Sequence, residues 1–228
     1  MSRVLPILFN TDMVRAILDG RKTVTRRVIK PQPTGKVEHH TGYQIDEWYE
    51  MKESESGCKC LSQMNPPYQP LDIMYVRETW WKNGDTYFYK AGCSKGLIDN
   101  MYVKWRPSIH MPKEAARIWL KVTDVRAERL QEITDEQAAR EGIRAYTKDD
   151  KLFKYAVTDD WWIDFHKKHR KLFSGTFWQD MPKTAKEALS YLWDSTIQKS
   201  DLDLYGWEAN PWVWRIEFER CEKPDNWN

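Results

Sequence analysis

The chain has 228 residues, of which 41% are hydrophobic and 31% charged, a length that suits one large domain with insertions and can bury a substantial core. Its net charge of +2 excludes a polycation, so any affinity for nucleic acid must come from local basic patches. No apolar run approaches the ~18 residues of a membrane span, and the sequence shows neither a signal peptide nor a disulfide framework. We therefore predict a cytoplasmic protein.

The first predicted elements are a strand, a short helix and a second strand. Residues 4–9 form an apolar run typical of a strand. Thr11 or Asp12 can cap the helix, whose apolar residues recur at nearly helical spacing, and Gly20 is its natural terminator. Residues 23–29 alternate and include β-branched side chains, which predicts the second strand.

Residues 34–65 carry scattered glycines, prolines and charges with little periodicity. We interpret them as a loop insertion that could contain one small hairpin. Within this insertion, Cys58 and Cys60 come after the neighbouring pair His39 and His40. Cysteine and histidine are the usual ligands of a structural zinc site. Structural zinc sites usually have C-x₂₋₄-C spacing and a second matched pair, so the sequence favours ordinary loop cysteines and no metal.

The following stretch predicts several strands and one short helix. The helix spans residues 133–143, with Thr134 as its N-cap, acidic residues in its first turn and Gly142 as its terminator. Strands are predicted over residues 71–80, 87–89 and 117–125.

Residues 146–204 are predicted to be a helical insertion, with helices over 161–170 and 184–193. The basic run 167–171 could follow a phosphate backbone, although a solvated helix face is the commoner role of such a run. His166 and His169 have no matching acidic or cysteine pair nearby in the sequence, so no metal is predicted here.

The chain is predicted to end in a strand after Pro211. Over residues 212–218 the side chains alternate, and one face carries Trp212, Trp214, Ile216 and Phe218. This aromatic face should close the core. The thirteen tryptophans favour a heavily aromatic core, with base stacking as the alternative.

The densest cluster of polar groups is Gly20-Arg21-Lys22-Thr23-Val24-Thr25-Arg26-Arg27. Its pattern, G-x-K-x-x-T-x-R, resembles the G-x-K-x-x-[ET]-x-R signature of ASCH domains, relatives of the PUA RNA-binding barrel. Residues 72–80, 133–143 and 210–214 resemble further stretches of the same family. The chain is most similar to long ASCH proteins of bacteriophages and prophages, which places it in a bacterial host.

This resemblance covers about residues 4–33, 66–145 and 205–220. It implies an α+β fold: a small, mixed PUA-like β-barrel with short flanking helices. The whole chain, residues 1–228, would be a single domain with two insertions, at 34–65 and 146–204.

The resemblance also implies a chemistry. Some small bacterial ASCH proteins are amidohydrolases that remove the acyl group of N4-acetylcytidine with a Lys-Thr-Glu constellation. Lys22 and Thr25 match its lysine and threonine, and Asp135-x-x-Ala138-x-x-Glu141 aligns with the helix that carries its glutamate. Thr25 would be the nucleophile, Lys22 its base and Glu141 an acid/base, with no metal or cofactor. A non-catalytic RNA- or DNA-binding module and a ribonuclease remain alternatives.

The predicted triad imposes a shape on the chain. In a flat strand Lys22 and Thr25 would point to opposite faces, so residues 20–23 must form a turn, with the strand starting near Val24. Burial or the neighbouring arginines would have to lower the pKa of Lys22 for it to act as a base. Otherwise Lys22 contacts phosphate and Glu141 is a helix-end carboxylate without a role.

The expected partner is a nucleoside or RNA, with DNA as a further option, and the protein is taken as a monomer without membrane contact. Tyr75 and Trp80 could stack a base but also suit the core, and Arg77 with Glu78 could form an ion pair instead. The candidate binding residues are Arg21, Arg26, Arg27, Tyr75, Arg77, Glu78 and Trp80.

Overall fold

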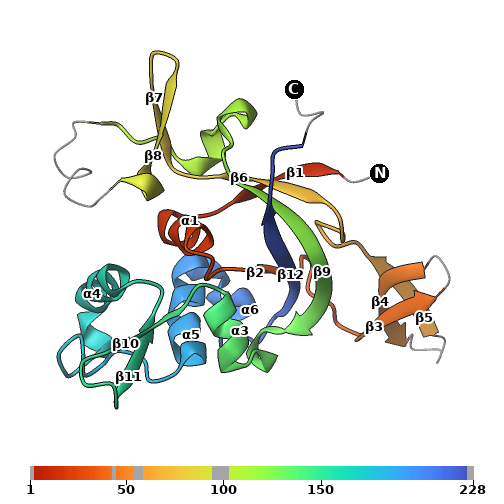
Figure 1. Ribbon diagram of the computed structural model, residues 1–228. Helices are drawn as coiled ribbons and strands as arrows, with labels where there is room; N and C mark the ends of the chain where they lie inside the picture. The colour runs from red at the N-terminus through yellow and green to blue at the C-terminus, as the bar shows by residue number, and fades with distance from the viewer. Residues whose placement is uncertain (1–2, 43–44, 54–58, 94–102, 225–228) are drawn as a thin grey trace.

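A five-stranded sheet, ordered β1-β6-β9-β12-β2, lies at the centre of the computed structural model (Figure 1). The structure describes residues 3–42, 45–53, 59–93 and 103–224. β1 runs parallel to β6, and the other neighbouring strands are antiparallel. The strands are β1 (Val4–Leu8), β2 (Val24–Val28), β6 (Ile73–Arg77), β9 (Trp119–Arg129) and β12 (Trp212–Cys221). Each of them was predicted from the sequence.

Helix α1 (Thr11–Leu18) connects the two edge strands, β1 and β2. Its N-cap is Asn10, whose side chain accepts a hydrogen bond from the backbone N–H of Met13 at 2.9 Å. The predicted caps, Thr11 and Asp12, are instead the first helical residues. Gly20 ends the helical turn with φ +74°, a conformation that glycine adopts without steric cost.

The predicted α+β class is confirmed, but the predicted closed barrel is not formed by the described residues. β1 and β2 are the two edges of the sheet and do not pair with each other. A side chain spans the gap instead, because Arg27 donates from Nη2 to the carbonyl of Leu8 at 3.0 Å. The sheet curves strongly yet stays open between these edges (Figure 1).

Residues 34–65 are more regular than the predicted loop insertion with one small hairpin. They contain a three-stranded antiparallel sheet of β3 (Lys36–Gly42), β4 (Ile45–Glu53) and β5 (Lys59–Met64), which projects from the central sheet on the side away from α4 and α5 (Figure 1). Trp48 joins it to the core through an edge-on contact with Trp214, with ring centroids 6.0 Å apart.

The two histidines of this sheet contact other side chains of the same sheet. His39 stacks on Trp48 at 4.2 Å, and His40 lies 3.3 Å from Glu38. Cys60 is exposed, and Cys58 lies outside the described residues.

The predicted strand over residues 71–80 is divided in two. β6 ends at Arg77, and β7 (Trp80–Asn83) forms a separate hairpin with β8 (Thr86–Tyr89). The division falls at Glu78, whose buried carboxylate accepts hydrogen bonds from Arg117 Nε at 2.9 Å and Nη2 at 3.1 Å.

The second insertion contains the two predicted helices and a hairpin that was not predicted. The hairpin pairs β10 (Arg144–Thr147) with β11 (Phe153–Ala156). The helices are α4 (Asp159–Lys168), α5 (Ala185–Thr196) and the short α6 (Leu202–Tyr205). α5 packs against β11 and against α3 (Asp135–Arg140), the predicted short helix capped by Thr134.

Most described tryptophan side chains are buried in, or packed against, a hydrophobic cluster, as the composition suggested. Trp119, Trp162 and Trp214 are buried, and Trp162 anchors an aromatic cluster in the second insertion. The aromatic face of β12 closes the main core through Trp214, Ile216 and Phe218. Among the described residues, no helix is both long and apolar enough to cross a membrane.

Candidate functional site

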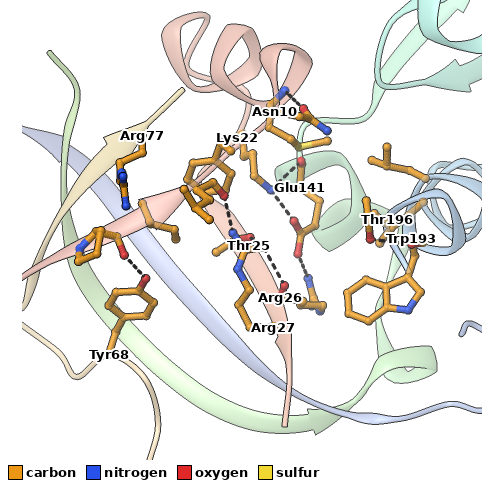
Figure 2. Close-up of a pocket in the computed structure, with 17 residues that line it drawn as sticks. Asn10, Lys22, Thr25, Arg26, Arg27, Tyr68, Arg77, Glu141, Trp193 and Thr196 are labelled. Atoms are coloured by element: carbon orange, nitrogen blue, oxygen red, sulfur yellow. Dashed lines mark hydrogen bonds and ion pairs between the residues drawn. The ribbon is translucent and has the colours of Figure 1, made fainter. Parts of the chain in front are cut away.

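A pocket of about 520 Å³ lies where the open edge of the sheet, α1 and α5 meet. Figure 2 shows Lys22, Thr25 and Glu141 near its centre, Arg77 and Tyr68 on one side, and Trp193 and Thr196 on the other. Its polar or charged lining residues are Asn10, Lys22, Thr25, Arg26, Arg27, Tyr68, Arg77, Glu141 and Thr196.

The segment before β2 forms the turn that the predicted triad requires. The backbone N–H groups of Arg21 and Lys22 both donate to the carbonyl of Ala16, at 2.9 and 3.0 Å. This folds the chain back beneath α1, and β2 begins only at Val24. Lys22 and Thr25 consequently line the same pocket instead of pointing to opposite faces.

Glu141 reaches Lys22 because the end of α3 pairs with the start of β2. Glu141 is the C-cap residue of α3, and an isolated antiparallel β-bridge joins it to Lys22. Gly142 then leaves the helix with φ +105°, and its carbonyl accepts a 2.6 Å hydrogen bond from Arg21 Nη1. The backbone therefore fixes Glu141 opposite Lys22.

The Glu141 carboxylate is buried between two cations. Lys22 Nζ donates to Glu141 Oε2 at 2.5 Å, to the Glu141 carbonyl at 3.0 Å and to the Val24 carbonyl at 2.7 Å. Arg26 donates from Nη1 to Glu141 Oε1 at 2.9 Å and from Nε to Glu128 at 2.8 Å. The charge of Arg26 is thus satisfied within the protein.

Burial and these neighbours shift the pKa of both members of the pair. Burial lowers the pKa of Lys22 and outweighs Glu141, which favours the ammonium, while Arg27 and Arg26 act in the same direction as burial. Burial alone would raise the pKa of Glu141, but Lys22 and Arg26 together hold it below its ordinary value. Glu141 is therefore an ionised carboxylate near neutral pH.

Thr25 presents its hydroxyl within the same pocket but contacts a different group. Its side chain is buried, and Oγ1 accepts a hydrogen bond from Arg27 Nη1 at 3.2 Å. Arg27 also lies over the ring of Phe9, 5.3 Å from its centroid. Thr25 and Arg27 are thus neighbours on the pocket wall, beside the Lys22–Glu141 pair (Figure 2).

Four of the predicted binding residues do not line this pocket. Arg21 bonds to Gly142 and Asp19, and Tyr75 contacts Trp119 in a tilted arrangement. Glu78 pairs with Arg117, and Trp80 is buried in a separate small cluster. The structure brings together Lys22, Thr25, Arg26, Arg27, Arg77 and Glu141.

Several lining residues were missed from the sequence. α5 contributes Leu189, Leu192, Trp193 and Thr196, although its sequence shows only an amphipathic helix. Tyr68, whose hydroxyl donates to the Pro6 carbonyl at 2.7 Å, lies in a stretch without periodicity. No sequence signal connects these residues to the motif at 20–27.

A second cavity of about 880 Å³, here called the insertion cavity, adjoins the pocket. Asn10 and Thr196 line both spaces. The insertion cavity is lined mainly by side chains of the second insertion, among them the aromatic Trp161, Phe165 and Tyr191, the basic Lys168 and Lys199, and the acidic Asp164 and Asp194. The rings of Trp161 and Phe165 stack at 5.0 Å.

The geometry at Gly142 leads to a first testable prediction. A Cβ built on Gly142 would lie 2.9 Å from the Cβ of buried Ala16, in addition to the cost of a positive φ. Gly142→Ala should therefore lower the free energy of unfolding by about 2–5 kcal/mol in urea denaturation.

Gly84→Ala is the matched control, because Gly84 also has a positive φ but no atom lies within 4 Å of its added Cβ. Its cost should be only about 1–2 kcal/mol, the cost of the left-handed conformation alone. Equal losses in both variants would contradict a steric role for Ala16.

No protein-family model, no curated protein and no solved structure matches this chain in comparisons with known proteins.

Proposed function

We propose that this protein is an ASCH-type, PUA-like protein, with a barrel left open between β1 and β2, and that its pocket hydrolyses an N4-acylcytidine-type amide. One observation carries the proposal. Lys22 and Thr25 of the motif and the distant Glu141 line a single pocket, with Lys22 Nζ 2.5 Å from the Glu141 carboxylate. The pocket volume of about 520 Å³ falls in the range of small-molecule sites. We place the activity in the cytoplasm of a bacterial host, on a nucleoside or RNA.

The chemistry starts from a charged pair. Lys22 donates three hydrogen bonds, which requires all three ammonium protons, so it must first transfer one proton to Glu141. The Thr25 hydroxyl then attacks the acyl carbon and gives its proton to the Lys22 amine. The C–N bond breaks as the exocyclic nitrogen takes the proton held by Glu141 and leaves as cytidine.

Water completes the reaction by the same route. After a second proton transfer from Lys22 to Glu141, water attacks the acyl-threonine ester and gives its proton to Lys22. The Thr25 oxygen leaves and takes the proton from Glu141, which restores the hydroxyl and releases the carboxylic acid. The net reaction consumes one amide and one water and yields one acid and one amine.

A non-catalytic nucleobase- or RNA-binding module is the second candidate, and a specific observation favours it. The three donors of Lys22 are fully used in the resting pocket, and the Thr25 hydroxyl contacts Arg27 rather than Lys22. An arrangement of this kind can hold a ligand without activating Thr25.

The test incubates the purified chain with N4-acetylcytidine and longer N4-acyl analogues and follows cytidine by chromatography. Rapid acid quench and peptide mass spectrometry should also find an acyl group on Thr25, because the mechanism passes through an ester. Absence of turnover with every acyl group would refute the hydrolase. Nucleoside or RNA binding that persists without turnover, weakening with added salt for RNA, would then support the binding module.

A further inference from the structure

The charges that line the pocket do not balance. Among its described lining residues, Lys22, Arg26, Arg27 and Arg77 are cationic, and Glu141 is the one carboxylate. Glu141 pairs with Lys22 and Arg26, and Glu128 supplies a second carboxylate to Arg26. Both carboxylates are thus already engaged, Glu128 also by Arg215 at 3.5 Å, and Arg27 and Arg77 remain without a paired carboxylate among the described residues.

Arg77 is held in place by backbone carbonyls rather than by an acid. It donates from Nε to the carbonyl of Met111 at 2.8 Å and from Nη2 to that of Ile109. A guanidinium carries five N–H donors, so the Nη1 group of Arg77 keeps its donors for a ligand. No carboxylate of a described residue forms an ion pair with it.

Arg27 is anchored in the same manner. Its Nη2 donates to the carbonyl of Leu8 at 3.0 Å, and its Nη1 donates to Thr25 and to the Arg26 carbonyl. Its Nε makes no hydrogen bond to any described residue. No carboxylate of a described residue forms an ion pair with Arg27. Leu8 is the register partner of Arg77 in the β1–β6 pair, so both arginine residues adjoin the end of β1, and both line the pocket.

We propose that Arg27 and Arg77 form a phosphate subsite, so that the ligand of the pocket is a nucleotide rather than an uncharged nucleoside. This inference rests on the proposed function for the identity of the base. Guanidiniums bind phosphate oxygens through paired N–H groups, and here both are pre-oriented by backbone carbonyls. The base would lie by Thr25 and Lys22, and the phosphate on the Arg77 side of the pocket (Figure 2).

The phosphate can belong to a free nucleoside monophosphate or to a phosphodiester within a strand. A nucleoside within a strand carries a second phosphodiester as well, and the insertion cavity beyond Asn10 and Thr196, on the side opposite Arg77, offers space for the nucleotide joined through it, with Trp161 and Tyr191 available for stacking (Figure 2). The ionisation of the phosphate distinguishes the two sources. A monoester gains its second negative charge near pH 6, whereas a diester does not.

The test measures binding to the full chain by isothermal titration calorimetry with cytidine, cytidine 5′-monophosphate, inorganic phosphate and acetate. The monophosphate should bind about tenfold or more tightly than cytidine. Inorganic phosphate should compete with it, and acetate at the same concentration should not. In Arg77→Gln the preference for the monophosphate should disappear while cytidine binding persists.

Arg15→Gln is the matched control. Arg15 on α1 also donates to two backbone carbonyls, those of Ala91 and Cys93, but it does not line the pocket. It should keep the preference for the monophosphate. Arg77→Lys retains the charge without the planar fork, should weaken the preference only in part, and serves as the test variant if Arg77→Gln does not fold.

Two further arms separate the sources of the phosphate. Cytidine 5′-(methyl phosphate) represents the diester. If the free nucleotide is the ligand, the affinity for the monophosphate should rise between pH 5 and pH 7, and the affinity for the methyl ester should not. Equal binding of the two esters, and tighter binding of a dinucleotide, indicates a strand.

The phosphate subsite is refuted if cytidine and its monophosphate bind equally, if acetate competes as well as phosphate, or if Arg77→Gln keeps the preference. A monophosphate preference without hydrolysis of any N4-acyl substrate would refute the proposed amidohydrolase and leave the subsite standing.

Discussion

Replacing Glu141 with alanine lowers the free energy of unfolding by about 3–5 kcal/mol, the cost of leaving buried charges unpaired. The Lys22 and Glu141 side chains are only 2% and 7% exposed, and that of Arg26 is 1% exposed. Removing the carboxylate leaves one fully uncompensated cation at Lys22 and weakens the pairing of Arg26 to Glu128 alone. Urea denaturation at pH 7 measures the loss.

Glu217→Ala is the control for this prediction. Glu217 pairs with Arg140, whose side chain is 45% exposed, and at 3.2 Å with Arg215. Arg215 keeps Asp124 and Glu128 when Glu217 is removed, so no buried cation is left unpaired and the expected loss is about 1 kcal/mol or less. A loss near that value for Glu141→Ala as well would mean that water reaches the Lys22–Glu141 pair and that the pocket is not preorganised.

The central sheet could be predicted because its strands have one buried face. In β12 the buried residues alternate with polar ones from Trp214 to Phe218, and that alternation is visible in the sequence. β3 and β5 lack it, because their side chains are mostly exposed or half-buried on both faces. Without a buried face there is no hydrophobic period to detect, and residues 34–65 looked like a loop.

The hairpin of β10 and β11 was missed for a related reason. Each strand has only four residues, and β11 buries Lys154, whose Nζ donates to the carbonyls of Gln179 and Met181 at 3.0 and 2.8 Å. A lysine at a buried position contradicts binary patterning. Its partners are backbone carbonyls of a distant segment, which the sequence does not reveal.

At the candidate site, local reasoning reached Lys22 and Thr25 and the turn that joins them. Gly20 marked the end of the helix, and the requirement for one shared face then located the turn. Glu141 was reached only through the family resemblance. The pairing of Arg26 with Glu128, and the lining of the pocket by α5, depend on contacts between segments far apart in the chain.

Lys22 contributes to the stability of the buried ion pair and is also the proposed general base. The same three hydrogen bonds that hold its ammonium in a buried place oppose its use as a base. Burial works in the other direction by lowering its pKa. The Lys22–Glu141 pair must therefore lose the proton that the reaction uses in a pH range below that of an ordinary lysine, and this can be measured.

Thr25→Val is expected to reduce kcat/KM for N4-acylcytidine by about 10³-fold or more, because it deletes the proposed nucleophile. Lys22→Met should reduce it by about 10²–10⁴-fold, the usual contribution of a general base. In the wild type, activity should fall as pH increases through the lowered pKa of Lys22, since the Lys22–Glu141 pair then loses the proton that Glu141 must pass to the leaving nitrogen. Lys22→Met should lack this fall.

Both variants should keep their fold, which separates this prediction from the one for Glu141. Valine matches the shape of Thr25, and Lys22→Met leaves Glu141 paired with Arg26, so the expected loss is about 1–3 kcal/mol for the acceptors that lose a donor. If Thr25 and Lys22 act in one step, the double variant should be no slower than the slower single variant. Effects that multiply would show that the two residues act independently, and Lys22 would then not be the base for Thr25.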